Sequence, residues 1–342
     1  MLNKLIDWSK GNFSELPWRL HRTLYNTLVS EIMLQQTTVT TVIPKFNEFI
    51  KRFPNIETLA KANEKEVLIY WQGLGYYRRA RSLHKAAITI FENYNCEIPT
   101  DKDLLMSIPG IGEYTSSAIL AIGFDKFQLA IDANLERIFS RVYEIKLCKG
   151  KDLKFLIQQK VNDKLFFPNI KKVSSREINE AFMDLGRTIC RQNKVECEIC
   201  PLKSICKSRN KKPLLLPLPS KKKSIKHNLE LNRIIISEGD KIFVIKREKG
   251  LWLEDQWEIP TFFKSSSDQG FLKTNQYKSL SSVKLSKKIV KTFKSAITKY
   301  VIVNHVYNGN INIIEKEGLK GRFVNPNKTK LHLTSSTLKA CY

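Results

Sequence analysis

Four of the seven cysteines lie within one 17-residue stretch, with the spacing C-x6-C-x2-C-x5-C. In a reducing compartment, thiols grouped in this way are more often metal ligands than disulfide partners. Zinc usually takes two Cys-x2-Cys pairs, whereas this stretch has a single pair, so the spacing favours an iron–sulfur centre over zinc. The expected ligands are Cys190, Cys197, Cys200 and Cys206.

Two acidic residues occupy positions at which a carboxylate could do acid–base chemistry. Glu31, within residues 30–37, borders an apolar helical stripe that contains Leu24 and Leu28, so its side chain could be partly desolvated. A solvated acid on a helix face is the alternative. Asp132 follows an apolar dipeptide and precedes a helix-like run, so it could cap that helix, and this role is compatible with a chemical one.

The segment Ile108-Pro109-Gly110-Ile111-Gly112 separates two helix-like runs, 104–108 and 115–122. Glycine lets the backbone approach a ligand closely, and N–H groups at the start of a helix can bind a phosphate oxygen. The pattern is that of a helix-hairpin-helix, and it makes Gly110 and Gly112 candidate phosphate contacts. A plain turn between helices is the alternative.

The 342-residue chain has 58 Lys and Arg against 33 Asp and Glu, which gives a formal net charge of +25. A surplus of this size favours polyanionic partners such as nucleic acid, although a lysine-rich composition can also have other origins. With 42% apolar residues, the composition excludes a disordered chain or a disulfide-stapled miniprotein. No apolar run approaches the ~20 residues that cross a bilayer, so we expect a cytoplasmic protein without membrane contact.

The elements that must position these residues change along the chain. Residues 22–187 have helical apolar spacing, whereas the Pro- and Lys-rich stretch 211–223 predicts an extended linker. Beyond it, 231–237 and 241–247 predict a hairpin around Glu238-Gly239-Asp240, and 300–304 with 310–314 predict a second pair of strands. The expected fold class is therefore mainly α, with a smaller α+β part at the C-terminal end.

Several motifs of the helical half stand in the order found in a known family. They are Leu16-Pro17-Trp18-Arg19, Ser30-Glu31-Ile32-Met33-Leu34-Gln35-Gln36-Thr37, Gly73-Leu74-Gly75-Tyr76-Tyr77, the glycine turn, Asp132 with Asn134, and the cysteine loop. Residues 10–209 thereby resemble the iron–sulfur, helix-hairpin-helix DNA glycosylases, and the adenine-specific MutY branch in particular. The resemblance implies a two-part helical glycosylase domain over 1–209 with a 4Fe-4S cluster in loop 190–206, a linker over 210–227 and a Nudix-like domain over 228–342.

The resemblance implies base-excision repair by monofunctional hydrolysis of the N-glycosidic bond of adenine mispaired with 8-oxoguanine or guanine. Glu31 would protonate adenine N7 and help to activate water, while Asp132 would stabilise the cationic sugar, with Tyr114 and Asn134 nearby. Glu31 must then hold a proton near neutral pH, which partial burial favours, and Asp132 must stay ionised, which helix-terminal donors favour. The residues implied at the adenine pocket are Leu16, Trp18, Arg19, Glu180 and Met183.

The implied partner is double-stranded DNA that contains an A:8-oxoguanine or A:G mispair, bound by a monomer at the nucleoid. Gln36 and Tyr76 would wedge into the base stack, while Gly110 and Gly112 would bind phosphate. At the position where some members carry a further pocket-lining arginine, this chain has Ser14.

Tyr114 stands two residues after the last glycine of the hairpin, where bifunctional relatives carry a lysine whose amine attacks the sugar C1′. A phenol cannot form an imine, so we expect no efficient β-lyase activity. The alternatives are an endonuclease III-like or mismatch thymine glycosylase, and a catalytically silent DNA-binding relative. The presence of both Glu31 and Asp132 speaks against the silent relative.

In the C-terminal part, Gly250-Leu251-Trp252 and Trp257-Glu258-Ile259-Pro260 resemble the Nudix-like domain with which the family recognises 8-oxoguanine. The recognition loop of that domain is expected at Val303-Asn304-His305, with His305 as a DNA contact. A working Nudix hydrolase holds divalent metal with clustered glutamates. No Glu-rich helix of this kind is evident after Gly250, so nucleotide pyrophosphatase activity is not expected.

Overall fold

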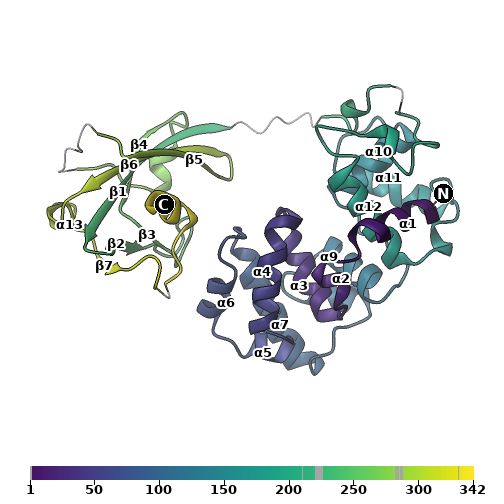
Figure 1. Ribbon diagram of the computed structural model, residues 1–342, viewed down its shortest axis with the longest axis horizontal. Helices are drawn as coiled ribbons and strands as arrows, with labels where there is room; N and C mark the ends of the chain where they lie inside the picture. The colour runs from purple at the N-terminus through teal and green to yellow at the C-terminus, as the bar shows by residue number, and fades with distance from the viewer. Residues whose placement is uncertain (1, 210, 220–225, 282–284, 286–287, 330) are drawn as a thin grey trace. The chain divides into compact units, whose positions relative to one another are not determined.

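The computed structural model describes residues 2–209, 211–219, 226–281, 285, 288–329 and 331–342. The chain divides into two compact units, Met1–Lys222 and Lys223–Tyr342. The first unit is helical and the second contains the β-sheet (Figure 1). In the part of the chain that is described, no helix has both the length and the apolar character needed to span a bilayer.

Side-chain caps fix where several helices of the first unit begin. Thr23, Asn55, Asp101, Asp132 and Ser174 each accept a hydrogen bond from a backbone N–H of the helix that follows. The helices of this unit are α1 (Leu2–Phe13), α2 (Pro17–Leu20), α3 (Leu24–Leu34), α4 (Val39–Arg52), α5 (Ile56–Ala60), α6 (Glu64–Tyr70), α7 (Arg78–Tyr94), α8 (Lys102–Ser107), α9 (Glu113–Ala118), α10 (Ala133–Tyr143), α11 (Lys151–Asn162) and α12 (Ser175–Thr188).

The helical unit has two main hydrophobic cores, which define two lobes. The first lobe, α2–α9, packs around residues such as Leu28, Phe49 and Trp71. The second lobe consists of α1 with α10–α12 and packs around Leu5 and Phe139. The chain begins in the second lobe, builds the first and then returns, so α1 lies against α12 (Figure 1). The two lobes meet where α3 and α12 pack against a π-helical turn, Ile119–Gly123, that continues α9.

The predicted linker over 210–227 differs from the structure in its first half. Leu216 is buried and its carbonyl oxygen accepts a hydrogen bond from Arg141 Nε at 3.1 Å, while the N–H of Leu218 donates to the carbonyl of Leu147 at 2.9 Å. The prediction of an extended tether is therefore wrong for 211–219, because the side chain of Leu216 and the backbone groups of Leu216 and Leu218 dock on the second lobe. Residues 210 and 220–225, which include the run Lys221-Lys222-Lys223, lie outside the described residues.

Among its described residues, the second unit contains a seven-stranded sheet with main strand order β3-β2-β1-β6-β5, in which β4 also pairs with β1 and β7 with β2. The predicted hairpin is confirmed, because β1 and β2 pair antiparallel next to Gly239-Asp240. The elements are β1 (His227–Glu238), β2 (Lys241–Lys246), β3 (Trp257–Glu258), β4 (Thr261–Ser266), β5 (Lys291–Ile297), β6 (Tyr300–Gly309), α13 (Asn312–Lys316), β7 (Gly321–Val324) and α14 (Ser335–Cys341).

The second predicted strand pair is wrong in one of its members. Strand β6 pairs antiparallel with β5 and parallel with β1, so both of its edges are occupied. Most of the predicted partner, 310–314, instead enters helix α13, where Ile313 packs in a core with Ile234 and Ile236 of β1. The sequence of β5 lacks a continuous apolar run, which is why its role as the partner was missed.

Candidate active site

A pocket opens between the lobes of the helical unit, where α2, α3 and α12 meet. Its wall includes Glu31 and all the residues expected at the adenine pocket, namely Leu16, Trp18, Arg19, Glu180 and Met183. The space amounts to about 470 Å³, part of which is open to solvent. The wall also contains residues that the sequence did not single out: Thr27, Ser30, Leu34, Val39, Ile122, Asp184 and Arg187.

Helix α3 places Glu31 on this wall with only 6% of its surface exposed. The hydroxyl of Tyr114 donates a hydrogen bond to Glu31 Oε2 at 2.9 Å. Burial raises the pKa of Glu31 to about 7; the hydrogen bond from Tyr114 opposes this shift, and the negative charge of Asp132 adds to it. The interpretation of Glu31 as a solvated acid is wrong, because every residue from Tyr25 to Met33 is buried.

Asp132 caps helix α10 and is enclosed by donors. Its Oδ1 accepts from the backbone N–H groups of Asn134 and Leu135 at 2.8 and 2.9 Å, and its Oδ2 accepts from Asn134 Nδ2 at 2.7 Å. The donors expected from the sequence are therefore present. Burial nevertheless outweighs them and raises the pKa of Asp132.

Asn134 is itself fixed by Arg137, which the sequence analysis missed. Arg137 Nη2 donates to Asn134 Oδ1 at 2.7 Å and to the carbonyl of Gly186 at 2.8 Å, and its Nε donates to the carbonyl of Cys190 at 2.8 Å. A Cβ atom on Gly186 would lie 2.5 Å from Asn134 Cβ, so only glycine permits α12 to come this close. The cap of α10 is thus held against α12 and the first cysteine.

A network of charged side chains surrounds Glu180. Arg22 donates from Nη1 and Nη2 to the two carboxylate oxygens of Glu180 at 2.6 and 3.1 Å. Arg19 Nε lies 3.5 Å from Glu180 Oε1, and Arg19 Nη1 donates to Asp184 Oδ2 at 2.8 Å. Glu180 and Asp184 are one helical turn apart, a spacing that could have drawn attention to Asp184. Ser14 lines a second cavity, which shares Arg19 and Glu180 with the first pocket and is also lined by Arg22.

Gln36 and Tyr76 lie on two loops and are not part of the pocket wall. Both are exposed, Tyr76 by 63%, and both have left-handed backbones, with φ of +57° and +46°. Residues other than glycine seldom adopt this conformation. The side chain of Arg79, which the sequence analysis did not single out, contacts both loops.

The glycine turn joins α8 to α9, as expected for a helix-hairpin-helix. Gly110 has φ of +86°, and a Cβ atom there would lie 2.5 Å from Ser82 Cβ, so glycine is required on both counts. Gly112 is exposed, and no atom lies within 4 Å of the place its Cβ would take. The backbone of the turn is therefore accessible to a ligand.

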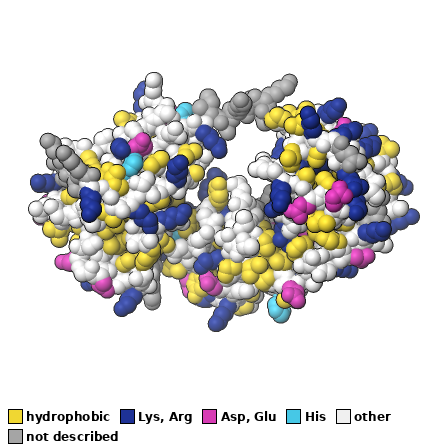
Figure 2. Space-filling view, turned by 45° about the horizontal axis from the view of Figure 1, so that its top comes forward, with side chains coloured by type: hydrophobic (Ala, Val, Ile, Leu, Met, Phe, Trp, Pro, Cys, Tyr) yellow, Lys and Arg dark blue, Asp and Glu magenta, His cyan; other side chains and the backbone are white. Residues whose placement is uncertain are grey.

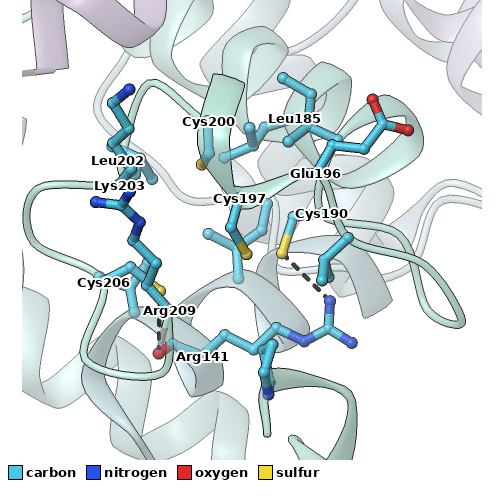
Figure 3. A pocket seen from close by; sticks show the side chains of 15 residues that line it. Arg141, Leu185, Cys190, Glu196, Cys197, Cys200, Leu202, Lys203, Cys206 and Arg209 are labelled. Atoms are coloured by element: carbon cyan, nitrogen blue, oxygen red, sulfur yellow. Dashed lines mark hydrogen bonds between the residues drawn. The ribbon is translucent and has the colours of Figure 1, made fainter. Parts of the chain in front are cut away.

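The four cysteines of the loop line one pocket in the second lobe, which they reach from different segments of the loop (Figure 3). Arg141, only 2% exposed, donates from Nη1 to Cys190 Sγ at 3.3 Å. Burial raises the pKa of the Cys200 thiol to about 11. Among the described residues, no three His, Cys, Asp or Glu side chains are grouped to hold a single metal ion. Four thiols around a shared space, beside a buried cation, fit a thiolate-bound cluster.

The expected recognition loop at Val303-Asn304-His305 is not a loop. The three residues lie in the middle of strand β6, and Asn304 is fully buried, where its Oδ1 accepts from Arg233. His305 Nε2 lies 3.1 Å from Glu230 Oε2 on the neighbouring strand β1. The position of the loop was wrong because His305 continues the apolar run of β6, which the sequence analysis ended at Asn304.

The helical unit has the fold of a DNA glycosylase. Residues 29–164 match the HhH-GPD superfamily of base excision DNA repair proteins. Among solved structures, a thermostable thymine-DNA glycosylase superposes with a TM-score of 0.52 over 61% of this chain and 94% of its own, at 24% sequence identity.

The sequence comparison defines the branch. An adenine DNA glycosylase of Buchnera aphidicola subsp. Baizongia pistaciae is 35% identical over 77% of this chain and 74% of its own length. The enzyme of the same name from subsp. Schizaphis graminum is 35% identical over 74% and 70%, and that of Homo sapiens is 33% identical over 60% and 39%. The chain therefore belongs to the adenine DNA glycosylase family.

Proposed function

We propose that this enzyme hydrolyses the N-glycosidic bond of adenine that is mispaired with 8-oxoguanine or guanine in DNA. The observation that carries the proposal is the buried carboxyl group of Glu31, with a pKa of about 7, on the wall of the pocket. A carboxyl group with this pKa is partly protonated at neutral pH and can act as a general acid. Membership of the adenine DNA glycosylase family supports adenine as the base.

Adenine must leave the double helix to reach Glu31. Extrusion of a base costs a few kcal/mol, and least at a mispair, so mispaired adenine is favoured. Leu16 and Trp18 offer apolar surface to the base, and the carboxylate of Glu180, held by Arg22, can accept a hydrogen bond from its amino group. Gln36 and Tyr76 fill the gap in the stack.

Phosphate contacts come from the accessible backbone of the turn at Gly110 and Gly112. On the face of the molecule drawn in Figure 2, Lys and Arg side chains outnumber Asp and Glu side chains, which supports a polyanionic partner. We assign double-stranded DNA as this partner, bound by a monomer at the nucleoid.

In the chemical step, Glu31 gives its proton to N7 of adenine. The C1′–N9 bond then breaks, its electron pair leaves with the base, and the sugar becomes an oxocarbenium-like cation. Water adds to C1′ and returns a proton to Glu31, which restores the acid. Because Tyr114 donates to Oε2, the proton that is transferred resides on Oε1.

Asp132 stabilises the cationic sugar in its ionised form. Three hydrogen bonds, all from the start of α10, stabilise the carboxylate against the effect of burial. A cation that develops next to the carboxylate opposes the rise in the pKa of Asp132 that burial causes, because opposite charges favour the ionised form. Asp132 and Glu31 thus act as an anion and an acid on the same nucleotide.

Tyr114 sets the reaction class. Its hydroxyl is engaged with Glu31, and the burial of the ring raises the pKa of Tyr114 well above its usual value. It has no amine with which to form an imine at C1′, so water is the nucleophile and no strand cleavage follows base release. This separates the proposal from an endonuclease III-like activity.

The cysteine loop would hold a 4Fe-4S cluster through Cys190, Cys197, Cys200 and Cys206. Such a cluster cross-links the loop through its thiolates and takes no part in breaking the glycosidic bond. Arg141 joins the loop to α10 through Cys190 Sγ and the carbonyl of Arg191, at 3.3 and 2.8 Å. The loop therefore supports the helix that Asp132 caps.

For the second unit we propose a Nudix-like domain, over 228–342, that recognises the base opposite adenine, while 1–209 is the glycosylase domain and 210–227 connects them. The centres of the Trp252 and Tyr300 rings lie 5.2 Å apart, so Trp252 packs against a hydrophobic core of this domain. Glu258 is buried in ion pairs with Arg233 and Arg247 at 3.2 and 3.3 Å. Its engagement supports a role in recognition over metal-dependent hydrolysis.

Release of adenine under single-turnover conditions tests the proposal. Adenine should be released fast when it is opposite 8-oxoguanine, more slowly when it is opposite guanine, and hardly at all when it is opposite thymine. Borohydride should trap no stable protein–DNA adduct. Iron analysis with visible absorption tests the cluster. Release of thymine but not adenine, or efficient adduct formation, would overturn the proposal.

A further inference from the structure

One guanidinium group, that of Arg79 near the start of α7, joins two loops that are far apart in the sequence. The first loop follows α3 and carries Gln36, and the second precedes α7 and carries Tyr76. Arg79 donates from Nη1 and Nη2 to six acceptors: the carbonyls of Ile32 (3.0 Å), Met33 (2.8 Å), Gln35, Leu74 (2.9 Å) and Gly75 (3.2 Å), and the hydroxyl of Thr37 (2.9 Å).

The chemistry of the acceptors explains why arginine stands here. The last carbonyls of a helix lack partners within the helix and attract a cation, and Ile32 and Met33 belong to the last turn of α3. A planar fork of donors can serve both loops at once, whereas a lysine ammonium is a single point. Burial lowers the pKa of Arg79 to about 10, which still leaves it charged at neutral pH.

The same bonds hold the chain on both sides of Gln36 and directly before Tyr76, the two residues with left-handed backbone. Gln35 and Thr37, on either side of Gln36, both bond to Arg79, and Gly75, next to Tyr76, does so as well. Left-handed backbone is unfavourable for a residue other than glycine and persists only where the surroundings impose it. The guanidinium carbon also lies 5.7 Å from the centre of the Tyr76 ring, within cation–π range.

We propose that Arg79 is the positioning residue for Gln36 and Tyr76, and that it holds both side chains ready to fill the gap left by the extruded adenine. The proposal rests on the proposed function, since it assigns Arg79 to base extrusion. Arg79 is absent from the wall of the pocket, so it acts on the step before bond cleavage. Its loss should slow reactions that need extrusion and spare those that do not.

The test compares two substrates under single-turnover conditions: adenine paired with 8-oxoguanine, and the same adenine unpaired opposite a tetrahydrofuran abasic analogue. Arg79→Ala and Arg79→Lys should slow release from the paired substrate about 10- to 100-fold, because small displacements of positioning groups have effects of this size. Release from the unpaired substrate should stay within about threefold of wild type by the same argument. The matched control is Arg81→Ala, which removes another arginine of α7; the side chain of Arg81 donates to Glu64 of α6.

A double-mutant cycle separates positioning from damage to the fold. Tyr76→Ala should slow the paired reaction in the wild-type background and add little in Arg79→Lys, since the ring is already misplaced. Equal losses on both substrates, or additive losses in the cycle, would overturn the proposal. A wild-type enzyme that releases adenine from neither substrate would instead refute the proposed function.

Discussion

Two carboxyl groups in the helical unit, the buried Glu31 and the half-buried Asp132, differ in their place on a helix, and this difference assigns their roles. Glu31 lies inside α3, where the backbone N–H groups are used by the helix, and it receives one hydrogen bond, from Tyr114. Asp132 precedes α10 and accepts three hydrogen bonds from its first residues. Burial raises the pKa of both, but the helix start provides donors that favour an anion and the helix interior does not.

The largest effect should come from Glu31→Gln, which keeps the shape of the side chain but removes the proton that it donates. We expect single-turnover adenine release to slow by about 10³-fold, a typical contribution of general acid catalysis. Affinity for the uncleaved duplex should stay near that of wild type. Rapid release by this variant would show that Glu31 is not the acid.

Asp132→Asn should slow release by about 10²- to 10³-fold, the range seen when one electrostatic contact to a transition state is lost. The Oδ1 of Asn can keep both backbone bonds that cap α10, but its amide nitrogen would face the donor Nδ2 of Asn134, so the melting temperature should fall by the equivalent of one hydrogen bond. The residual rate should still fall as pH rises through the pKa of Glu31. Disappearance of that pH dependence would mean that the two carboxyl groups titrate as one unit.

The burial of Glu31 should also be visible in the absence of substrate, in how the free energy of unfolding depends on pH. The folded pKa of about 7 exceeds the ordinary 4.5, so the folded state is penalised as pH rises between these values and fully penalised above them. Glu31→Gln should therefore raise the free energy of unfolding by at most about 3 kcal/mol at alkaline pH, from 1.36 kcal/mol per pH unit, and by little in acid. Urea unfolding at several pH values measures this, and a difference independent of pH would contradict it.

The smallest effect should follow from Tyr114→Phe. The hydroxyl lowers the pKa of Glu31, so its removal should raise that pKa. Because the protonated form of Glu31 is the active one, the alkaline limb of the pH–rate profile should move to higher pH. An alkaline limb at the same pH as in wild type would show that the hydrogen bond from Tyr114 to Glu31 is not maintained in the complex with DNA.

Local sequence signals predicted the groups that depend on their neighbours in the chain. Asp132 with Asn134 and the glycine turn are examples, since a cap and a tight turn are made by consecutive residues. The cysteine spacing was equally informative. The burial of Glu31 was not predictable, because it depends on the packing of α3 against α2, α4, α7 and α9.

Arg79 and Arg137 escaped sequence analysis for a different reason. Their main acceptors are backbone carbonyls. Every residue has a carbonyl group, so the residue types in the sequence do not indicate which carbonyls an arginine will bind. The pairing of β5 with β6 and the docking of 211–219 were missed because their partners are set by the rest of the fold.

The path of the chain through its two lobes has a consequence for synthesis. Helix α1 leaves the ribosome before the first lobe does, but its partner α12 follows only after that lobe, and Ser9 meets Asp184 only then, at 2.6 Å. The first lobe is contiguous in sequence and can form its core before α12 is available for α1 to pack against. Nascent chains arrested before α12 emerges should protect the first lobe from protease and leave α1 open to cleavage; protection of α1 at that stage would exclude this order.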